Sequence, residues 1–516
     1  KGPENEWPEN VQHAKSGFQF RDEELLFTSE IDNGFFTRED EWQYMVYRPI
    51  EAERGMDPNS DLYSPGYYSL SLKAGEAAGI YAIAAHKTAP EHTGFQWYES
   101  KTDIRYLPEV QNIKKTLEQS IRAFIVNRNR NKTVIAGYPW FLDWGRDTLI
   151  CLRGIIAAGY TEEAKSIIRE FASLEKKGTL PNVIRATDTS NRDTSDAPLW
   201  LFVALADLIN DAQDPFLKTD CNQRTLKEVL HSIATHYISG TPNGIKMDPQ
   251  SGLIYSPSHF TWMDTNHPAG TPREGYPIEI QALWFYSVKL LSEIFPSESQ
   301  WPSLYDQIKA SINTFFVVNH SFNENQPRQD TYLADCLHTN GFQPAKNAIQ
   351  DDHLRPNQLF AITLGAIDDP ELCKKMVTAC EELIIPGAIR TLADRPVSYK
   401  LPIYHQGELL NNPEYPYQSI YTGTEDTSRK PAYHNGTAWT WPFPSYCEAL
   451  IKTYGKNAHA KASDILSTSI KLLNTGCINQ IPEILDGNYP HLQKGCYAQA
   501  WGITEFYRMA LKLELI

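Results

Sequence analysis

The chain has 516 residues, of which 41% are hydrophobic and 22% charged, and its formal net charge at pH 7 is -15. This composition supports a large folded core and excludes a disordered chain. The negative charge disfavours nucleic acid and anionic membranes as partners, because both require basic patches. A neutral polysaccharide is a compatible partner. The aromatic content of 12% fits either a large aromatic core or sugar-stacking surfaces.

Neither a transmembrane segment nor a signal peptide is visible. No apolar run reaches the ~20 residues that span a bilayer, and the chain opens without a leader pattern. The 8 cysteines are scattered, without the close spacing of a zinc site. We therefore expect a reduced cytoplasmic protein that needs no metal or organic cofactor. Because the sequence begins Lys-Gly-Pro rather than Met, we also expect a fragment or a processed chain.

The first ~100 residues are rich in β-formers. Short alternating or apolar runs at 43–47, 67–72 and 79–85 predict strands. From about Pro108 apolar residues recur at three- and four-residue spacing, which predicts helices. We expect a small, truncated β-rich region over 1–104, the remnant of a β-sandwich, followed by a helical domain over 105–516.

The helical part is predicted to contain twelve helices, at about 108–128, 146–158, 161–176, 195–212, 224–239, 277–296, 298–318, 355–367, 369–383, 437–455, 457–475 and 497–512. Short connections alternate with long ones, the latter at 129–145, 177–194, 240–276, 319–354, 384–436 and 476–496. This alternation predicts an inner and an outer ring of helices, with every long loop at one end. Long loops in a compact domain are usually functional, so we expect the active site there. The alternative is an irregular helical domain with insertions.

The first two long loops carry dense clusters of polar and aromatic residues. Residues 137–147 read Gly-Tyr-Pro-Trp-Phe-Leu-Asp-Trp-Gly-Arg-Asp. There Trp144 can stack on a sugar, Arg146 can donate a fork of hydrogen bonds, and Asp147, as an acceptor-only anion, can bind two hydroxyls. Residues 180–200 contribute Arg185 and Asp196, the latter at a helix start where capping is the alternative role. Asp193 is a competing carboxylate, and its proximity would raise one of the two pKa values.

Three further loops extend the pattern. Trp262, Asp264 and Glu279 follow in 261–279, where Glu279 could bind substrate or pair with Arg273. Residues 432–441 contain His434, structural or substrate-binding, and Trp439. In 476–487 Glu483 stands between apolar pairs and would be costly to bury without a task, whereas Asp486 before Gly487 fits a turn. The phosphate-loop, dinucleotide-fingerprint and nucleophile-elbow motifs are absent, and paired carboxylates among aromatics suit glycoside hydrolysis.

These motifs resemble the amylo-α-1,6-glucosidase part of glycogen debranching enzymes, in the bacterial and archaeal type. The resemblance runs in the family's order over nearly the whole helical part, through Thr194–Trp200, Thr261–Asp264, Pro277–Trp284, Leu354–Phe360, Tyr433–Trp439, Glu483–Gly487 and Ala498–Trp501. It also takes in residues 48–66 before the helical part. Two departures, Ala438-Trp-Thr-Trp441 and Pro482, put fine substrate choice in doubt but leave the carboxylates in place.

The resemblance implies a mainly α fold, an (α/α)6 toroid, and an inverting hydrolase that removes α-1,6-linked glucose from glycogen or another branched α-glucan. It implies that Asp196 is the general acid, that Glu483 is the general base, and that Trp144, Arg146 and Asp147 hold the terminal glucose. Two alternatives remain: another toroid glycosidase of glucoamylase or trehalase type, and a non-catalytic glycan-binding protein.

Overall fold

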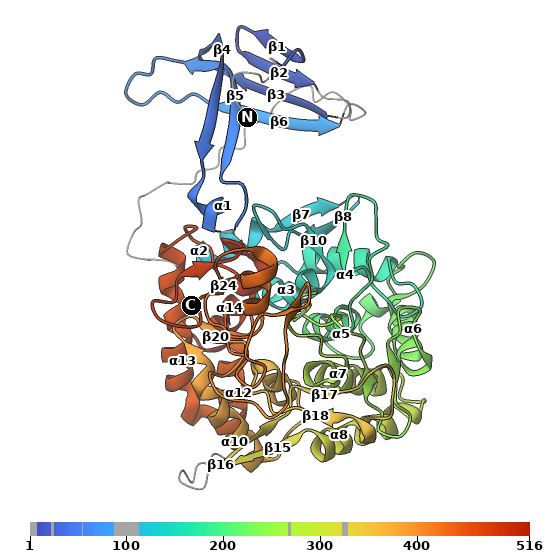
Figure 1. Ribbon diagram of the computed structural model, residues 1–516. Coiled ribbons are helices and arrows are strands. Elements are labelled where there is room, and N and C mark those ends of the chain that lie inside the picture. The colour runs from blue at the N-terminus through green and yellow to red at the C-terminus, as the bar shows by residue number, and fades with distance from the viewer. Residues whose placement is uncertain are drawn as a thin grey trace. The chain divides into compact units, whose positions relative to one another are not determined.

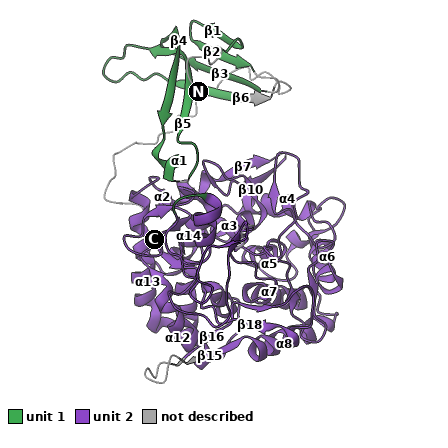
Figure 2. Ribbon diagram, viewed as in Figure 1, with its two compact units in different colours: residues 1–109, 422–424 green, residues 110–421, 425–516 purple. Residues whose placement is uncertain are grey.

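The computed structural model describes residues 8–21, 25–53, 55–86, 113–128, 130–266, 270–321 and 329–516. The chain divides into two compact units, residues 1–109 with 422–424, and residues 110–421 with 425–516 (Figure 2). The second unit is mostly helical with small sheets (Figure 1), which confirms the prediction of a mainly α protein. The predicted boundary at 104/105 falls within 87–112, outside the described residues.

The first unit is built from antiparallel strands. β1 (Val11–Ala14), β2 (Gly17–Arg21), β3 (Leu25–Ile31) and β6 (Ile80–His86) form a sheet in that order, and β4 (Phe35–Tyr47) pairs with β5 (Asn59–Ser69). A short helix, α1 (Pro49–Glu53), lies between β4 and β5 in the chain. The predicted strand at 43–47 lies within β4, and the one at 79–85 overlaps β6. The strand predicted at 67–72 extends too far, because β5 and its pairing end at Ser69.

A helix lies in each of the twelve segments predicted to be helical. The helices of the second unit are α2 (Ile113–Arg122), α3 (Gly145–Ala157), α4 (Thr161–Ser173), α5 (Ala197–Leu208), α6 (Leu226–Ser239), α7 (Ile278–Ile294), α8 (Gln300–Phe315), α9 (Leu359–Thr363), α10 (Pro370–Cys380), α11 (Lys430–Tyr433), α12 (Phe443–Tyr454), α13 (His459–Ser467) and α14 (Ala500–Lys512). Residues 108–112 of the first predicted helix lie outside the described residues.

Helices α2, α12 and α9 are shorter than predicted, because strand pairing takes over the remaining residues or a glycine ends the helix. After α2, β7 (Ile125–Arg128) pairs with β8 (Asn131–Val134). The segment 437–455 starts as β23 (Ala438–Trp439), so α12 begins only at Phe443. α9 is cut to five residues by Gly365, which adopts a φ of 83° that favours glycine.

Six helices pack against one another in a closed succession. They are α3, α5, α7, α9, α12 and α14, each in contact with the next, with α14 returning to α3. Residues 197–205 of α5 are all buried, as expected for a segment that is apolar on every side. Helix α4 is amphipathic instead, with one face buried, and α6 is fixed at its start by a reciprocal capping box between Thr225 and Glu228.

The long connections are not structureless, because short strands join them to one another. β10 (Asp143–Trp144) pairs with β11 (Val183–Ile184), β14 (Gly275–Pro277) with β17 (Cys336–His338), β20 (Ala388–Arg390) with β23, β23 with β24 (Ile484–Leu485), and β26 (Ala498–Gln499) with β9 (Gly137–Tyr138). Ser195 N–H donates to Phe260 O, and Ala393 N–H to Leu354 O, between loops that no strand pair joins. The loops that carry the predicted site residues are therefore tied together by backbone hydrogen bonds.

Nine further strands belong to the described residues of the second unit. They are β12 (Lys246–Met247), β13 (Ile254–Tyr255), β15 (Val317–Ser321), β16 (Gln329–Leu333), β18 (Ile349–Gln350), β19 (Ile384–Ile385), β21 (Tyr404–His405), β22 (Glu408–Leu409) and β25 (Gln493–Lys494). Over the described residues, no helix combines the length and apolarity that crossing a bilayer requires. All 8 cysteines carry free thiols.

Candidate active site

Arg146 lies between two carboxylates at the start of α3. Its Nε donates to Asp196 Oδ2 at 2.6 Å and its Nη1 to Asp264 Oδ2 at 3.0 Å. The guanidinium is 2% exposed, and its Nη2 is buried without a hydrogen-bond partner among the described residues. The preceding strand pair β10–β11 fixes where α3 begins, because Gly145 N–H also donates to Asn182 O. Arg146 therefore connects three of the long loops and retains a donor for a ligand.

Asp196 is at the N-cap position of α5 but does not cap it. The side chain of Thr194 takes that role, because its hydroxyl accepts from Ala197 N–H at 3.3 Å and donates to Asp196 Oδ1 at 2.7 Å. The capping alternative for Asp196 is therefore not what the structure shows. Its carboxylate is 1% exposed and is held by Arg146 on one oxygen and Thr194 on the other.

Glu483 is also buried and held on both oxygens. Its Oε2 accepts from the Cys496 N–H at 2.8 Å, and its Oε1 accepts from the Tyr433 hydroxyl. Burial, followed by the charge of Glu483, raises the pKa of Tyr433 well above its ordinary value, so that the phenol stays a donor. Gly495 is required beside the carboxylate, because a Cβ there would stand 2.3 Å from Glu483 Oε2.

Asp147 is buried among the charges of Arg146, Asp264 and Glu483. Burial raises its pKa to about 8, the charges of Asp264 and Glu483 act in the same direction, and Arg146 opposes them. The carboxyl therefore holds a proton near neutral pH and can donate as well as accept. The expectation of an acceptor-only anion is corrected here, because the sequence does not show how completely this side chain is desolvated.

An aromatic cluster adjoins these carboxylates. His434 stacks on Trp439 with ring centroids 5.2 Å apart, and Trp262 meets both rings edge-on. Burial, with the charges of nearby arginines, lowers the pKa of His434 well below its ordinary value, so the imidazole is neutral. Thr265 contacts its Nδ1 at 2.8 Å, while Nε2 lacks a partner among the described residues. The indole N–H groups of Trp441 and Trp501, whose rings stack at 5.0 Å, also have no partner within the described part of the chain.

Glu279 belongs to a buried ion network. It receives two hydrogen bonds from Arg273, at 2.5 and 2.6 Å, and Arg273 also binds Asp335 at 2.6 Å. Asn357 joins Asp335 to the indole of Trp262. Of the two roles open to Glu279 from sequence, the structure shows the ion pair with Arg273. Asp335 and Asn357 connect this pair to the aromatic cluster.

The remaining predicted residues lie in different surroundings. Trp144, two positions before Arg146, is half-buried and pairs with Val183, whereas Arg185 is exposed on the turn after β11. Asp193 is exposed while Asp196 is buried. Asp486 is buried and accepts from Tyr421 N–H, which agrees with a structural role. The described residues hold no group of three or more His, Cys, Asp or Glu arranged to bind a metal ion.

Sequence reasoning did not single out Thr194, Tyr433 or the Cys496 N–H, although these groups hold the two carboxylates. A signal exists for two of them: Thr194 precedes Asp196 by two positions, and Tyr433 directly precedes His434. The backbone donor of Cys496 left no trace in the sequence, because any residue but proline supplies an N–H.

Comparison with known families decides the class of the protein. The family described as Amylo-alpha-1,6-glucosidase matches residues 119–508, and the one described as Glycogen debranching enzyme N terminal matches residues 3–78. The chain belongs to the amylo-alpha-1,6-glucosidase family. It is a glycoside hydrolase of the glycogen debranching enzyme type, as its motifs predicted.

A curated relative, the glycogen debranching enzyme of Saccharomyces cerevisiae, is 24% identical over 401 residues. The match takes in 62% of this chain but only 25% of the yeast protein, so the chain spans about a quarter of that relative. Among solved structures, a wild-type glycosidase and a glycosidase variant in complex with glucose each share 10% identity and a TM-score of 0.49, over 78% of this chain and 97% of theirs. The membership of this glucosidase family rests on the sequence matches.

Proposed function

We propose that this glycoside hydrolase removes single α-1,6-linked glucose branches from a glycogen limit dextrin by an inverting acid/base mechanism. The observation that carries the proposal is a pair of buried carboxylates, Asp196 and Glu483, each held by donors on both oxygens. Burying two such groups is costly without a task, and inverting glycosidases require two carboxyl groups with opposite proton duties.

In this proposal Asp196 is the general acid. The Nε–H of Arg146 can only donate, so Oδ2 remains an acceptor. The proton then resides on Oδ1, where the Thr194 hydroxyl can rotate and accept it in place of donating. Oδ1 delivers this proton to the departing glycosidic oxygen, and the fixed guanidinium keeps the carboxyl in one orientation throughout.

Glu483 is the proposed general base. It removes a proton from a water molecule that attacks the anomeric carbon from the opposite face of the sugar. The Tyr433 hydroxyl and the Cys496 N–H fix the carboxylate. Room for the water requires that the two carboxyl groups stand about 6.5–9.5 Å apart, whereas roughly 5 Å would suit a retaining enzyme.

We assign glucose binding to the groups between these carboxylates. Trp144 and Trp439 supply ring faces, Arg146, Asp147 and Asp264 supply hydrogen bonds, and Trp262 with His434 shapes the wall. The donors Arg146 Nη2 and Trp501 Nε1, which have no partner in the part of the chain that the structure describes, support this assignment, since buried polar groups without partners are rare unless a ligand completes them. Arg185, which is exposed, would contact the glucan chain beyond the bound terminal glucose.

We further propose that the closed succession of six helices is the inner ring of an (α/α)6 toroid, with α2, α4, α6, α8, α10 and α13 outside it. The helix contacts support this arrangement.

We also propose that the strands of the first unit are part of a β-sandwich. The match of residues 3–78 to the N-terminal family of debranching enzymes supports this.

Incubation with a phosphorylase limit dextrin tests the proposal. Free glucose should appear, and NMR should show β-glucose first, because inversion of an α-linkage yields the β-anomer. α-Glucose as the first product would rule out inversion. Faster hydrolysis of maltose or trehalose would favour the alternative toroid glycosidases, and glucan binding without glucose release would favour a binding protein.

A further inference from the structure

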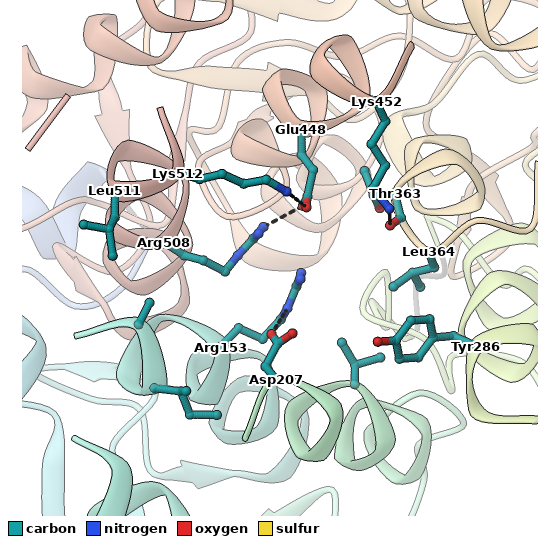
Figure 3. Close-up of a pocket in the computed structure, with 13 residues that line it drawn as sticks. Arg153, Asp207, Tyr286, Thr363, Leu364, Glu448, Lys452, Arg508, Leu511 and Lys512 are labelled. Carbon is teal, nitrogen blue, oxygen red and sulfur yellow. Dashed lines mark hydrogen bonds and ion pairs between the residues drawn. The ribbon is translucent and has the colours of Figure 1, made fainter. Parts of the chain in front are cut away.

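A second candidate site lies at the other ends of the six central helices. A cavity of about 470 Å³ is lined by side chains from α3, α5, α7, α9, α12 and α14 (Figure 3). Asp196 stands at the N-cap position of α5 and Arg146 in the first turn of α3, whereas Arg153 and Asp207 lie further along α3 and α5. The cavity is therefore separate from the glucosidase site.

Cations outnumber carboxylates in this cavity. Its charged lining consists of Arg153, Asp207, Glu448, Lys452, Arg508 and Lys512. Arg153 is paired with Asp207 at 2.9 Å, and Glu448 is shared by Arg508 at 3.0 Å and Lys512 at 2.8 Å. Behind them Glu505 binds Arg508 at 2.7 Å. With Glu505 included, four cations face three carboxylates, in a protein whose overall charge is -15.

Lys452 forms no ion pair with a carboxylate among the residues that the structure describes. Its Nζ donates to the Thr363 carbonyl at 2.5 Å, a neutral acceptor. Desolvation lowers the pKa of Lys452, and although Glu448 opposes this, the charges of Lys512 and Arg153 add to it. An anion placed beside Lys452 would relieve that repulsion.

Figure 3 shows Lys452 and Lys512 on one helix each, α12 and α14, with Tyr286 across the cavity from them. Ammonium and guanidinium groups together bind phosphate oxygens well. Tyr286 and the aliphatic side chains of Ile156 and Leu364 supply an apolar wall, and the volume falls within the range of small-molecule sites.

We propose that this cavity binds a small phosphate monoester of the size of a monosaccharide phosphate, with its phosphate against Lys452 and Lys512 and its carbon skeleton beside Tyr286. Because the cations outnumber the carboxylates by one, the cavity attracts an anion, and its apolar wall excludes larger hydrated anions. The site is independent of the proposed debranching reaction.

Calorimetric titration of the full chain with glucose 6-phosphate, inorganic phosphate and glucose tests this proposal. Glucose 6-phosphate should bind saturably, and Lys452→Gln should weaken it about tenfold, the effect of one charge-assisted hydrogen bond. Lys374→Gln provides a matched control, because Lys374 is a half-buried lysine on α10 that pairs with Glu371. It should leave the affinity unchanged, and neither variant should alter the binding of glucose.

Three results would overturn the site: no saturable binding of glucose 6-phosphate, equal weakening in both variants, or an unchanged affinity in Lys452→Gln. Equal affinity for inorganic phosphate and the ester would overturn the sugar-phosphate assignment. If Lys452→Gln lowers the melting temperature, Lys512→Gln replaces it, since Arg508 still pairs with Glu448 in that variant.

Discussion

The Nε of Arg146 donates to Oδ2 of Asp196 across 2.6 Å, and both side chains are almost completely buried. Because the same guanidinium also binds Asp264, its plane is fixed from two sides. An arginine held in this way cannot take a proton from the carboxyl, so it orients the carboxyl group without exchanging a proton with it. A proton carried by Asp196 would therefore lie on Oδ1, the oxygen that faces Thr194.

Asp196→Asn should therefore reduce kcat on a limit dextrin by at least ~10²-fold, the scale of general-acid catalysis. The amide keeps the shape but has no acidic proton to give to the leaving oxygen. The rate of glucose release measures the effect. Asp193→Asn is the matched control, since Asp193 is exposed three positions earlier, and it should retain full activity. Full activity in Asp196→Asn, or a comparable loss in both variants, would falsify the acid assignment.

Tyr433→Phe should lower kcat/KM by about tenfold, because a hydrogen bond to a charged group is lost. The acidic limb of the pH–rate profile should also move to higher pH, since a carboxylate that loses a donor is protonated more easily. A purely structural tyrosine would leave that limb in place.

Tyr415→Phe removes another tyrosine–carboxylate contact, the one to Asp394, and it should alter neither the rate nor the profile. The assignment of Tyr433 as a positioning residue fails if the two variants behave alike.

The helices could be predicted because their burial follows the apolar periodicity of the sequence. Segment 161–176, for example, contains α4, whose buried residues Ala164, Ile167, Ile168 and Phe171 recur at three- and four-residue spacing. The strand pairs between loops could not be predicted. Trp439 pairs with Ile484 in β23–β24, a contact between distant segments of two residues each, too short for a period-2 pattern to be visible.

The candidate site likewise contains residues that the sequence could identify and contacts that it could not. Arg146 and Glu279 could be identified as unusual charges at helix starts, but their partners are determined by tertiary packing. Arg146 binds Asp196 and Asp264, whereas Glu279 faces Arg273. Nothing in the local sequence distinguishes an arginine that retains a free donor from one that is saturated by carboxylates.

Glu279→Gln should destabilise the fold by about 3 kcal/mol, because it leaves the buried Arg273 with one carboxylate fewer. Urea unfolding followed by circular dichroism measures the change. Glu293→Gln, at an exposed position of the same helix, should change the free energy of unfolding by less than about 0.5 kcal/mol. If Glu279→Gln instead kept its stability and raised only KM, Glu279 would be a substrate ligand and not part of the framework.

Asp147→Asn should change how stability depends on pH. The pKa of Asp147 is about 8 in the fold, against an ordinary value of 3.8, so between these values the folded state holds a proton that the unfolded state releases. The contribution of this proton to the free energy of unfolding is complete below about pH 4 and is lost as pH rises through about 8. Since Asn does not titrate, the variant should gain stability relative to the parent across that window, by an amount on the order of 5 kcal/mol at most.

The difference between the two proteins isolates this effect, because every other titrating group is common to both. Thermal unfolding at pH 5 and pH 8 measures it, with Asp193→Asn as the exposed control whose difference from the parent should be independent of pH. A difference for Asp147→Asn that stayed constant, or that grew toward acid, would mean that Asp147 is ionised in the fold. In that case Asp147 would meet the sugar as an acceptor only, and the hydroxyl that binds it would have to donate.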